Sequence, residues 1–253
     1  MLKRVLLGVV LVVLVLVIAV GTVLYRSFAG GMPPDEKPLA GGALPILDGF
    51  VAAFTVPTEQ ADKVILIDCG KDKTAAAIKA ALAARKQTIA AVFLTHGHWD
   101  HVGGCTAAGL GAAAPVYALA DEVAIVAGDE GTLGPVAKLL GAHHLGVKVT
   151  NPLKDGDAVD ILGTTVKVYQ TAGHTRGSAV YLARGTAFFG DAAGASDQGE
   201  VKAAIWIFSD DTALAARSLR ALAGKLQNEK VEQFAFAHTG PTSADLKKLA
   251  AVE

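Results

Sequence analysis

Apolar and polar positions divide the chain into three zones. Residues 5–24 are almost wholly Val, Leu, Ile, Ala and Gly with no charge, and residues 29–42 mix Gly, Pro and charged residues without an apolar period. From residue 43 onward, short apolar runs alternate with polar turns, as expected for a domain built of strands and helices. The pattern predicts an N-terminal segment over residues 1–28, a linker over residues 29–42 and one domain over residues 43–253.

The apolar segment has the length of a transmembrane helix. Its 20 residues, at about 1.5 Å each, span roughly 30 Å, the thickness of a bilayer's hydrocarbon core. Lys3 and Arg4 precede it and only Arg26 follows closely, which predicts a membrane anchor with the domain outside the cytoplasm. The alternative is a signal peptide cleaved near residues 27–29, leaving a secreted or periplasmic domain, although the apolar run exceeds the usual length of about 7–15 residues.

Strand and helix patterns alternate along the domain. Strands are predicted at residues 50–56, 63–67, 89–94, 116–119, 158–162, 165–170, 178–183, 187–189 and 233–237. Helices are predicted at residues 74–85, from residue 101, and at residues 122–127, 209–226 and 242–251. The continuous apolar run at residues 89–94 is typical of a strand buried on both faces. The alternation indicates an α/β fold with packed sheets and helices outside them.

Composition argues against two classes of protein. Without Lys3, Arg4 and Arg26, 20 basic residues accompany 24 acidic ones, which is not the clustered positive charge expected for nucleic-acid binding. The two cysteines, Cys69 and Cys105, are too few for a disulfide-stapled scaffold or a Cys-rich zinc module. They could form one bridge, but we prefer to interpret them as buried thiols. We expect a small-molecule substrate and no nucleic-acid partner, and the sequence leaves the oligomeric state open.

Histidine and aspartate gather directly after the predicted strand at residues 89–94. Residues 95–101 read THGHWDH, which places His96, His98, Asp100 and His101 within six positions. His96 and His98 are one residue apart, so in an extended segment they point the same way. Asp100 and His101 follow at a turn and can face a second centre. So dense a cluster indicates metal binding rather than surface or capping roles.

Three later residues complete a candidate ligand set. His174 lies in TAGHTRGS at residues 171–178, Asp191 ends the segment FGD, and His238 follows the last predicted strand. Each alone is equally compatible with a turn or cap, and their order after the first cluster makes them candidates. One metal would take His96, His98 and His174, a second would take Asp100, His101 and His238, and Asp191 would bridge them. Such ligands favour two zinc ions, with iron or manganese as alternatives.

Together these motifs resemble those of the metallo-β-lactamase-fold hydrolases, most of all the glyoxalase II-type branch. Residues 66–70, 95–104, 171–178, 188–192 and 238–240 carry the resemblance, and the match runs from about Leu44 to the C-terminus. It implies an αββα sandwich with the metals at one edge of the two sheets. It also implies that a metal-bridging hydroxide attacks a carbonyl or a related ester. Asp100 would handle protons as well as bind metal, and Asp68 would orient the ligand loop.

Departures from the family pattern narrow the expected substrate. Asp191 stands where true β-lactamases of this fold typically lack a carboxylate, which disfavours antibiotic hydrolysis. Only 15 residues follow His238, too few for the helical region that binds glutathione in glyoxalase II. Ala172 and Arg176 replace frequent prolines, and Arg176 is either a contact for a substrate carboxylate or, as we prefer, an exposed turn residue. Trp99 either walls the site or packs in the core.

The sequence therefore predicts a binuclear metallohydrolase acting on a small ester, thioester or lactone. An iron-dependent oxidoreductase resembling persulfide dioxygenases is the first alternative, but such enzymes would not need Asp100, His101 and His238 all as ligands. A non-catalytic metal-binding protein of the same fold is the second. It is disfavoured because none of the expected ligands is missing from the sequence.

Overall fold

Two compact units make up the computed structural model, which describes residues 2–28, 31, 34–111 and 114–253. The first unit covers Met1–Gly31 and contains helix α1 (Leu2–Phe28). The second unit covers Met32–Glu253 and contains the sheets and the other described helices. All seven candidate ligands belong to the second unit.

The prediction of a membrane anchor is wrong. Among the residues that the structure describes, no helix combines the length and the apolar character needed to cross a bilayer. The extracytoplasmic, secreted or periplasmic location inferred from this segment is therefore wrong as well. The predicted linker and the alternative cleavage site include residues 29–30 and 32–33, which lie outside the described residues.

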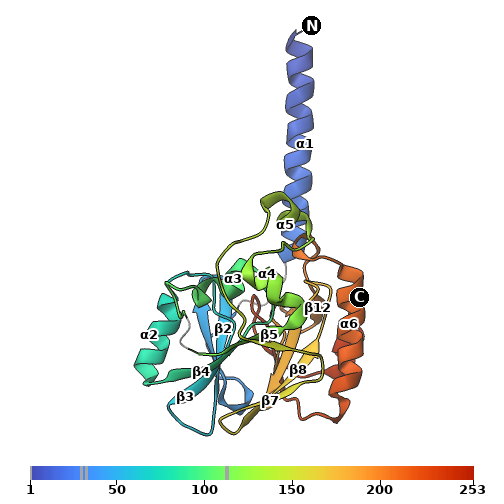
Figure 1. Ribbon diagram of the computed structural model, residues 1–253. Helices are drawn as coiled ribbons and strands as arrows, with labels where there is room; N and C mark the ends of the chain where they lie inside the picture. The colour runs from blue at the N-terminus through green and yellow to red at the C-terminus, as the bar shows by residue number, and fades with distance from the viewer. Residues whose placement is uncertain (1, 29–30, 32–33, 112–113) are drawn as a thin grey trace. The chain divides into compact units, whose positions relative to one another are not determined.

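Six strands form the first sheet of the second unit (Figure 1). They are β1 (Leu44–Asp48), β2 (Val51–Pro57), β3 (Lys63–Ile67), β4 (Thr88–Phe93), β5 (Val116–Leu119) and β6 (Asn151–Leu153), and they hydrogen-bond in this order. The first three strands pair antiparallel, whereas β3 to β6 pair parallel. Parallel neighbours require a crossover connection, and helix α2 (Ala76–Arg85) lies in the one between β3 and β4.

The second sheet also has six strands. They are β7 (Ala158–Ile161), β8 (Thr164–Gln170), β9 (Ala179–Ala183), β10 (Thr186–Phe188), β13 (Gln233–Ala235) and β14 (Thr242–Ser243). Their order is β14-β13-β10-β9-β8-β7, and every pair is antiparallel except β10 with β13. Between β10 and β13 the chain forms the hairpin of β11 (Ala193–Ala195) with β12 (Val201–Ala203), followed by helix α6 (Thr212–Lys225).

Three apolar layers hold the sheets and helices together. Phe93 of β4 and Phe188 of β10 belong to the layer between the two sheets. Val92 of β4 belongs instead to the layer that contains Ile78 of α2, and Leu219 of α6 lies in the layer outside the second sheet. Figure 1 shows α2 and α6 on opposite sides of the paired sheets. The predicted α/β sandwich is confirmed, as is the burial of the strand at residues 89–94 on both faces.

Short helices and 3-10 turns lie in the connections between these longer elements. They are α3 (Trp99–Val102), α4 (Val123–Ala127), α5 (Pro135–Leu140) and α7 (Leu246–Ala250), with the single 3-10 turns η1 (Ala40–Gly42), η2 (Gly103–Cys105), η3 (Ala120–Glu122), η4 (Trp206–Phe208) and η5 (Leu226–Asn228). The sequence patterns did not predict β1, β6, β11, β12 or α5, and residues 242–243, predicted as helix, form strand β14. The helix predicted at residues 242–251 begins only after Asp245, whose side chain accepts hydrogen bonds from the backbone N–H groups of Lys247 and Lys248. A capping carboxylate of this kind fixes a helix start.

Cys69 and Cys105 are paired in a disulfide, so their interpretation as separate buried thiols is wrong. Their Cα atoms lie 5.5 Å apart, within the range that a bridge requires. A backbone hydrogen bond keeps the two cysteine-bearing segments close together, because the N–H of Cys69 donates to the carbonyl oxygen of His101 at 2.7 Å. This bond joins the segment after β3 to the segment after β4.

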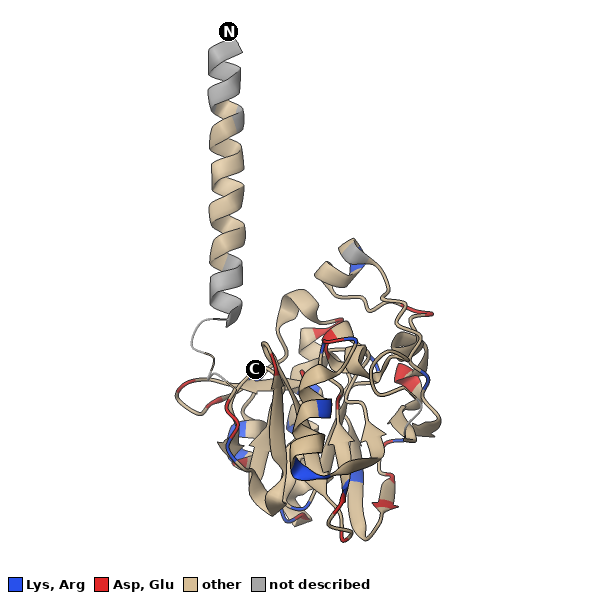
Figure 2. Ribbon diagram, turned by 90° about the vertical axis from the view of Figure 1, so that its left-hand side faces the viewer, with Lys and Arg blue, Asp and Glu red and all other residues tan. Residues whose placement is uncertain are grey.

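Basic and acidic residues are interspersed along the ribbon of the second unit (Figure 2). Several form ion pairs, such as Lys225 with Asp155 at 2.6 Å and Lys248 with Glu200 at 2.9 Å. Exposed pairs of this kind each contribute only about 0–1 kcal/mol, whereas burying one large apolar side chain contributes about 1.5–3 kcal/mol. The apolar layers, rather than the surface charges, therefore stabilise the unit.

Candidate metal centre

Four strands of the two sheets lead directly into polar site residues. Asp68 follows β3, and His96 follows its parallel neighbour β4. In the second sheet, Asp191 follows β10, and His238 follows its parallel neighbour β13. Since parallel neighbours end at the same edge of a sheet, residues far apart in sequence gather there. The structure brings all seven candidate metal ligands together in two adjoining groups.

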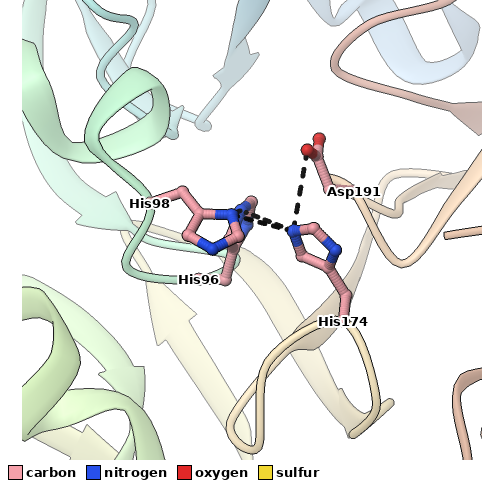
Figure 3. A group of neighbouring side chains, drawn as sticks. All are labelled: His96, His98, His174 and Asp191. Carbon is pink, nitrogen blue, oxygen red and sulfur yellow. Dashed lines mark hydrogen bonds and ion pairs between the residues drawn. The ribbon is translucent and has the colours of Figure 1, made fainter. Parts of the chain in front are cut away.

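The first trio consists of His96, His98 and His174 (Figure 3). Nε2 of His96 lies 3.1 Å from Nδ1 of His98 and 3.2 Å from Nε2 of His174, and 3.0 Å separates the last two atoms. The three rings stand at 82–89° to one another. Three ring nitrogens thus converge on one point, as three ligands of a tetrahedral ion do.

The second trio consists of Asp100, His101 and His238. Oδ2 of Asp100 lies 3.3 Å from Nε2 of His238 and 3.9 Å from Nε2 of His101. His101 is fully buried, whereas the side chains of Asp100 and His238 retain some exposure. The second trio therefore lies nearer to solvent on one side than the first.

Asp191 lies between the two trios. Its Oδ1 is 3.2 Å from Nε2 of His101 and 3.2 Å from Nε2 of His238. Its Oδ2 is 3.7 Å from Nε2 of His174 in the first trio, a contact drawn in Figure 3. Each oxygen of this carboxylate thus faces a different trio, which is the geometry expected of a bridging residue.

Each of the five histidines has one ring nitrogen that is not directed at the other candidate ligands. This outer nitrogen lies within hydrogen-bond distance of a protein oxygen. These contacts measure 2.8–3.2 Å. For His96, His98, His101, His174 and His238 the oxygens belong, in that order, to Thr95, Thr132, Asp68, Ser209 and the backbone of Phe50. Such outer contacts fix the orientation of an imidazole and leave its other nitrogen for a metal ion.

Asp68 supports the ligand loop through both of its oxygens. Oδ2 accepts a hydrogen bond at 2.8 Å from Nδ1 of His101 and another at 2.8 Å from the hydroxyl of Thr95. Oδ1 accepts from the backbone N–H of Thr95 at 2.8 Å. Asp68 has a φ of 58°, in the left-handed region that residues other than glycine seldom occupy. Backbone strain of this kind persists where the surroundings impose it, often at functional sites.

Burial and charge set the protonation of the two trios differently. Burial holds the pKa of His96 well below its usual range and lowers the pKa of His98 to about 4 and that of His174 to about 3. The first trio is therefore neutral at pH 7, as metal binding requires. Burial acts against protonation of His238 as well, but the Asp191 carboxylate raises the pKa of that ring to about 10. Without a metal ion, the second trio thus carries a protonated imidazole.

Two buried polar atoms at the centre, Nε2 of His101 and Oδ1 of Asp191, make no hydrogen bond of good geometry among the described residues. They lie 3.2 Å from each other as an ion pair, and a cation between the side chains would give both of them a direct partner. Imidazole and carboxylate without thiolate form a donor set suited to zinc, iron or manganese. The residues present therefore fit divalent metal ions.

Sequence reasoning missed several residues that support the ligands. Glu122 is fully buried and contacts two of the ligand loops, while Thr132 and Ser209 contact His98 and His174. Burial raises the pKa of Glu122 to about 7, although hydrogen bonds from both loops act to lower it. The sequence offered no local signal for this role, because an acidic residue at a helix start is common and the partners of Glu122 lie 25, 53 and 55 residues away.

The structure distinguishes between the alternatives left open for other polar and aromatic residues. Arg176 pairs with Glu130 and donates to the backbone oxygen of Asp121 at 2.8 Å, which agrees with an exposed turn residue. Trp99 remains 40% exposed, so it does not pack in the core. Its ring meets that of Phe50 edge-on, with centroids 6.1 Å apart.

Comparisons with known proteins find relatives that match part of the chain. The hydroxyacylglutathione hydrolase of Salmonella typhi is 31% identical over 137 residues, which cover 54% of this chain and 45% of that protein. An uncharacterized protein of Mycobacterium tuberculosis is 37% identical over 97 residues, or 37% of this chain and 43% of that one. The chain thus spans less than half the length of the curated relatives it matches.

Solved structures resemble the second unit in fold. The crystal structure of BLEG-1, a B3 metallo-beta-lactamase, has a TM-score of 0.64 at 21% identity, covering 81% of this chain and 95% of that chain. A metallo-beta-lactamase family protein from Thermus thermophilus has a TM-score of 0.57 at 23% identity, covering 82% of this chain and 76% of that one. The sequence profile of the Metallo-beta-lactamase superfamily matches residues 51–232. With most of its length covered by that profile, the chain belongs to the metallo-β-lactamase superfamily.

Proposed function

We propose that this protein is a binuclear metal-dependent hydrolase of a small ester, thioester or lactone. The superfamily consists mostly of hydrolases, and its fold implies divalent metal ions. Curated relatives named hydroxyacylglutathione hydrolase make a thioester one of the substrates to test. Those relatives match over less than half of their own length, so the proposal does not extend to their particular substrate.

The position of Asp191 between two complete trios carries the proposal. One carboxylate oxygen faces His101 and His238 at 3.2 Å each, while the other faces His174 at 3.7 Å. A site for one ion would need neither the second trio nor a carboxylate shared in this way. The arrangement thus favours two ions, with zinc first and iron or manganese as alternatives.

The residues of the chain would divide the work of such a reaction. His96, His98 and His174 would hold one ion, Asp100, His101 and His238 the other, and Asp191 would contact both. When bound, divalent ions polarise a carbonyl oxygen and lower the pKa of water so that hydroxide is present at neutral pH. Asp100 combines an acidic side chain with partial exposure at the centre. It is therefore the candidate to accept or donate a proton during hydrolysis.

The two alternative functions make less use of this site. An iron-dependent oxidoreductase acting on persulfides would not need Asp100, His101 and His238 together, yet they lie within ligand distance of one another. A non-catalytic member of the fold would have no need to keep both trios and the shared carboxylate. Neither alternative gains support from another feature of the described residues.

Metal analysis combined with a substrate screen tests the proposal. Purified protein should contain or take up two divalent ions per chain and hydrolyse at least one compound among thioesters, lactones, phosphodiesters and β-lactams, with esters added to the panel. Chelation should remove the activity, and zinc should restore it. One iron per chain, together with oxygen consumption in the presence of a persulfide, would overturn the hydrolase proposal.

A further inference from the structure

Glu122 is a buried carboxylate that belongs to neither trio. It ends the turn η3 at the start of α4, and its side chain is 0% exposed. Its Oε1 accepts a hydrogen bond from the backbone N–H of Gly97 at 2.7 Å. Its Oε2 accepts from the backbone N–H of Gly177 and from the hydroxyl of Thr175, both at 2.9 Å. Three donors from two other segments thus converge on one side chain.

The two segments are the loops that supply the first trio. Gly97 stands between His96 and His98, and Thr175 directly follows His174. These loops lie 78 residues apart in the chain, and they leave different sheets, since one follows β4 and the other follows β8. Glu122 therefore connects the two loops through a single rigid group.

Both loops also pack closely against η3 and the start of α4. A Cβ atom at Gly97 would lie 2.7 Å from Cγ2 of Ile125 and 2.9 Å from the backbone nitrogen of Val126. A Cβ atom at Gly177 would lie 2.6 Å from the backbone nitrogen of Glu122. No side chain fits in either gap, so the loops meet η3 and α4 along their backbones. The hydrogen bonds and the packing thus fix the same two loops.

A contribution to the stability of the fold does not by itself explain why a buried glutamate occupies position 122. A buried carboxylate is costly to desolvate, and apolar residues of similar volume often serve a core as well or better. The hydrogen bonds of the Glu122 carboxylate run to the ligand loops and not along its own helix. The neighbouring Asp121 differs, because its carboxylate accepts from the half-buried side chain of Gln170 at 2.9 Å.

We propose that Glu122 is a positioning residue that sets the spacing of His96, His98 and His174 for a divalent cation. The inference rests on the proposed function, since it assumes that this trio binds metal. It predicts an effect confined to one of the two ions, because the second trio makes no hydrogen bond with Glu122 among the described contacts. A residue that only stabilised the fold would weaken both sites alike.

The test separates the two sites before changing Glu122. H238A weakens the second trio and H98A weakens the first, so each variant leaves one intact trio. Zinc affinity of the remaining site is measured by competition with a chromophoric chelator, with and without E122Q. In E122Q an NH₂ group replaces one of the two carboxylate oxygens. This NH₂ group is a hydrogen-bond donor and would face a donor from one of the loops, so the two groups cannot hydrogen-bond. We expect E122Q to weaken zinc binding by at least about 10-fold in the H238A background, and to leave it unchanged in the H98A background.

Two further variants keep the result interpretable. D121N changes the adjacent carboxylate and should leave both affinities unchanged. T175V removes only one of the three hydrogen bonds and should weaken the first site less than E122Q does, which provides the test if E122Q does not fold by circular dichroism. Equal losses at both sites, or unchanged binding at the first site, would overturn the role of Glu122 alone. A wild-type chain that binds no divalent ion would overturn this inference and the proposed function together.

Discussion

The ring of Phe50 stacks on the ring of His238, with centroids 5.7 Å apart, and the backbone oxygen of Phe50 accepts a hydrogen bond from Nδ1 of that histidine at 3.0 Å. One residue thus supports a candidate ligand in two ways. The hydrogen bond depends only on the backbone, whereas the ring contact depends on the side chain. That side chain is 53% exposed and lies edge-on to Trp99, so the pair presents an aromatic surface beside the second trio.

Replacing Phe50 by alanine should separate these two contributions. The backbone hydrogen bond remains, so metal content should stay at the wild-type value. Loss of the exposed ring removes apolar contact worth about 1 kcal/mol with a substrate, which corresponds to a rise in KM of roughly fivefold. Steady-state kinetics on esters with increasingly long acyl groups measures the effect, and kcat should change little.

The matched control for Phe50→Ala is Leu162→Ala. Leu162 is also exposed, but it lies in the turn between β7 and β8. Its replacement should leave KM unchanged for every acyl length. A Phe50→Ala variant that loses metal while KM stays constant would mean that the ring supports His238 and does not contact substrate.

His98→Ala should abolish whatever hydrolytic activity the protein has. The substitution removes one of three nitrogens that lie 3.0–3.2 Å apart, and with it the three-nitrogen set that would hold one ion. Loss of an outer contact typically costs 10–100-fold in metal affinity or activity, so loss of a ligand should cost more than about 100-fold. His143→Ala is the control, since His143 lies outside both trios. Activity that survives both His98→Ala and chelation would refute the site.

Much of this architecture follows from local patterns in the sequence. The strand at residues 89–94 is predictable because both of its faces are apolar, and the THGHWDH segment is predictable because six positions hold four ligand-type residues. Glu122 is not predictable in the same way, since its three partners lie 25, 53 and 55 residues away. The pairing of Cys69 with Cys105 likewise depends on the packing of two loops. Local spacing carries no information about such contacts.

The membrane prediction was wrong for a related reason. It rested on the local composition of residues 5–24 alone, whereas no helix among the described residues is both long and apolar enough to cross a bilayer. In the second unit, by contrast, a continuous apolar run predicts a strand buried on both faces at β4. Side chains of β3, β4 and β10 indeed share the layer between the two sheets, so local composition and observed packing agree there.

Asp68→Asn should weaken the second trio more than the first. The carboxylate of Asp68 accepts from Nδ1 of His101 at 2.8 Å, and an amide presents an acceptor on only one side. We expect zinc affinity at the second site to fall by about 10–100-fold, with binding at the first site nearly unchanged. Isothermal titration with zinc gives both affinities in one experiment. Asp62→Asn, at an exposed position, should alter neither, and equal losses at both sites would assign Asp68 to folding alone.

Zinc binding to the two trios should respond to pH in different ways. The pKa of His174 is about 3 and that of His98 about 4, so both rings are already neutral from pH 6 to 8 and binding to the first trio releases no proton. The pKa of His238 is about 10, so its ring is protonated over the same range and must lose that proton to bind metal. Affinity at the second trio should therefore rise about tenfold per pH unit for each proton displaced, while affinity at the first stays flat.

Calorimetry in buffers of different ionisation enthalpy counts these protons directly. The H98A variant leaves the second trio intact, and zinc binding at pH 7 should release one proton from His238. It should also release one from His101, because the surrounding carboxylates raise the pKa of that ring against the effect of burial. The H238A variant leaves the first trio intact and should release none. Release of protons by H238A but not by H98A would reverse the assignment of charge to the two trios. It would also mean that the Asp191 carboxylate does not keep the His238 ring protonated in the metal-free protein.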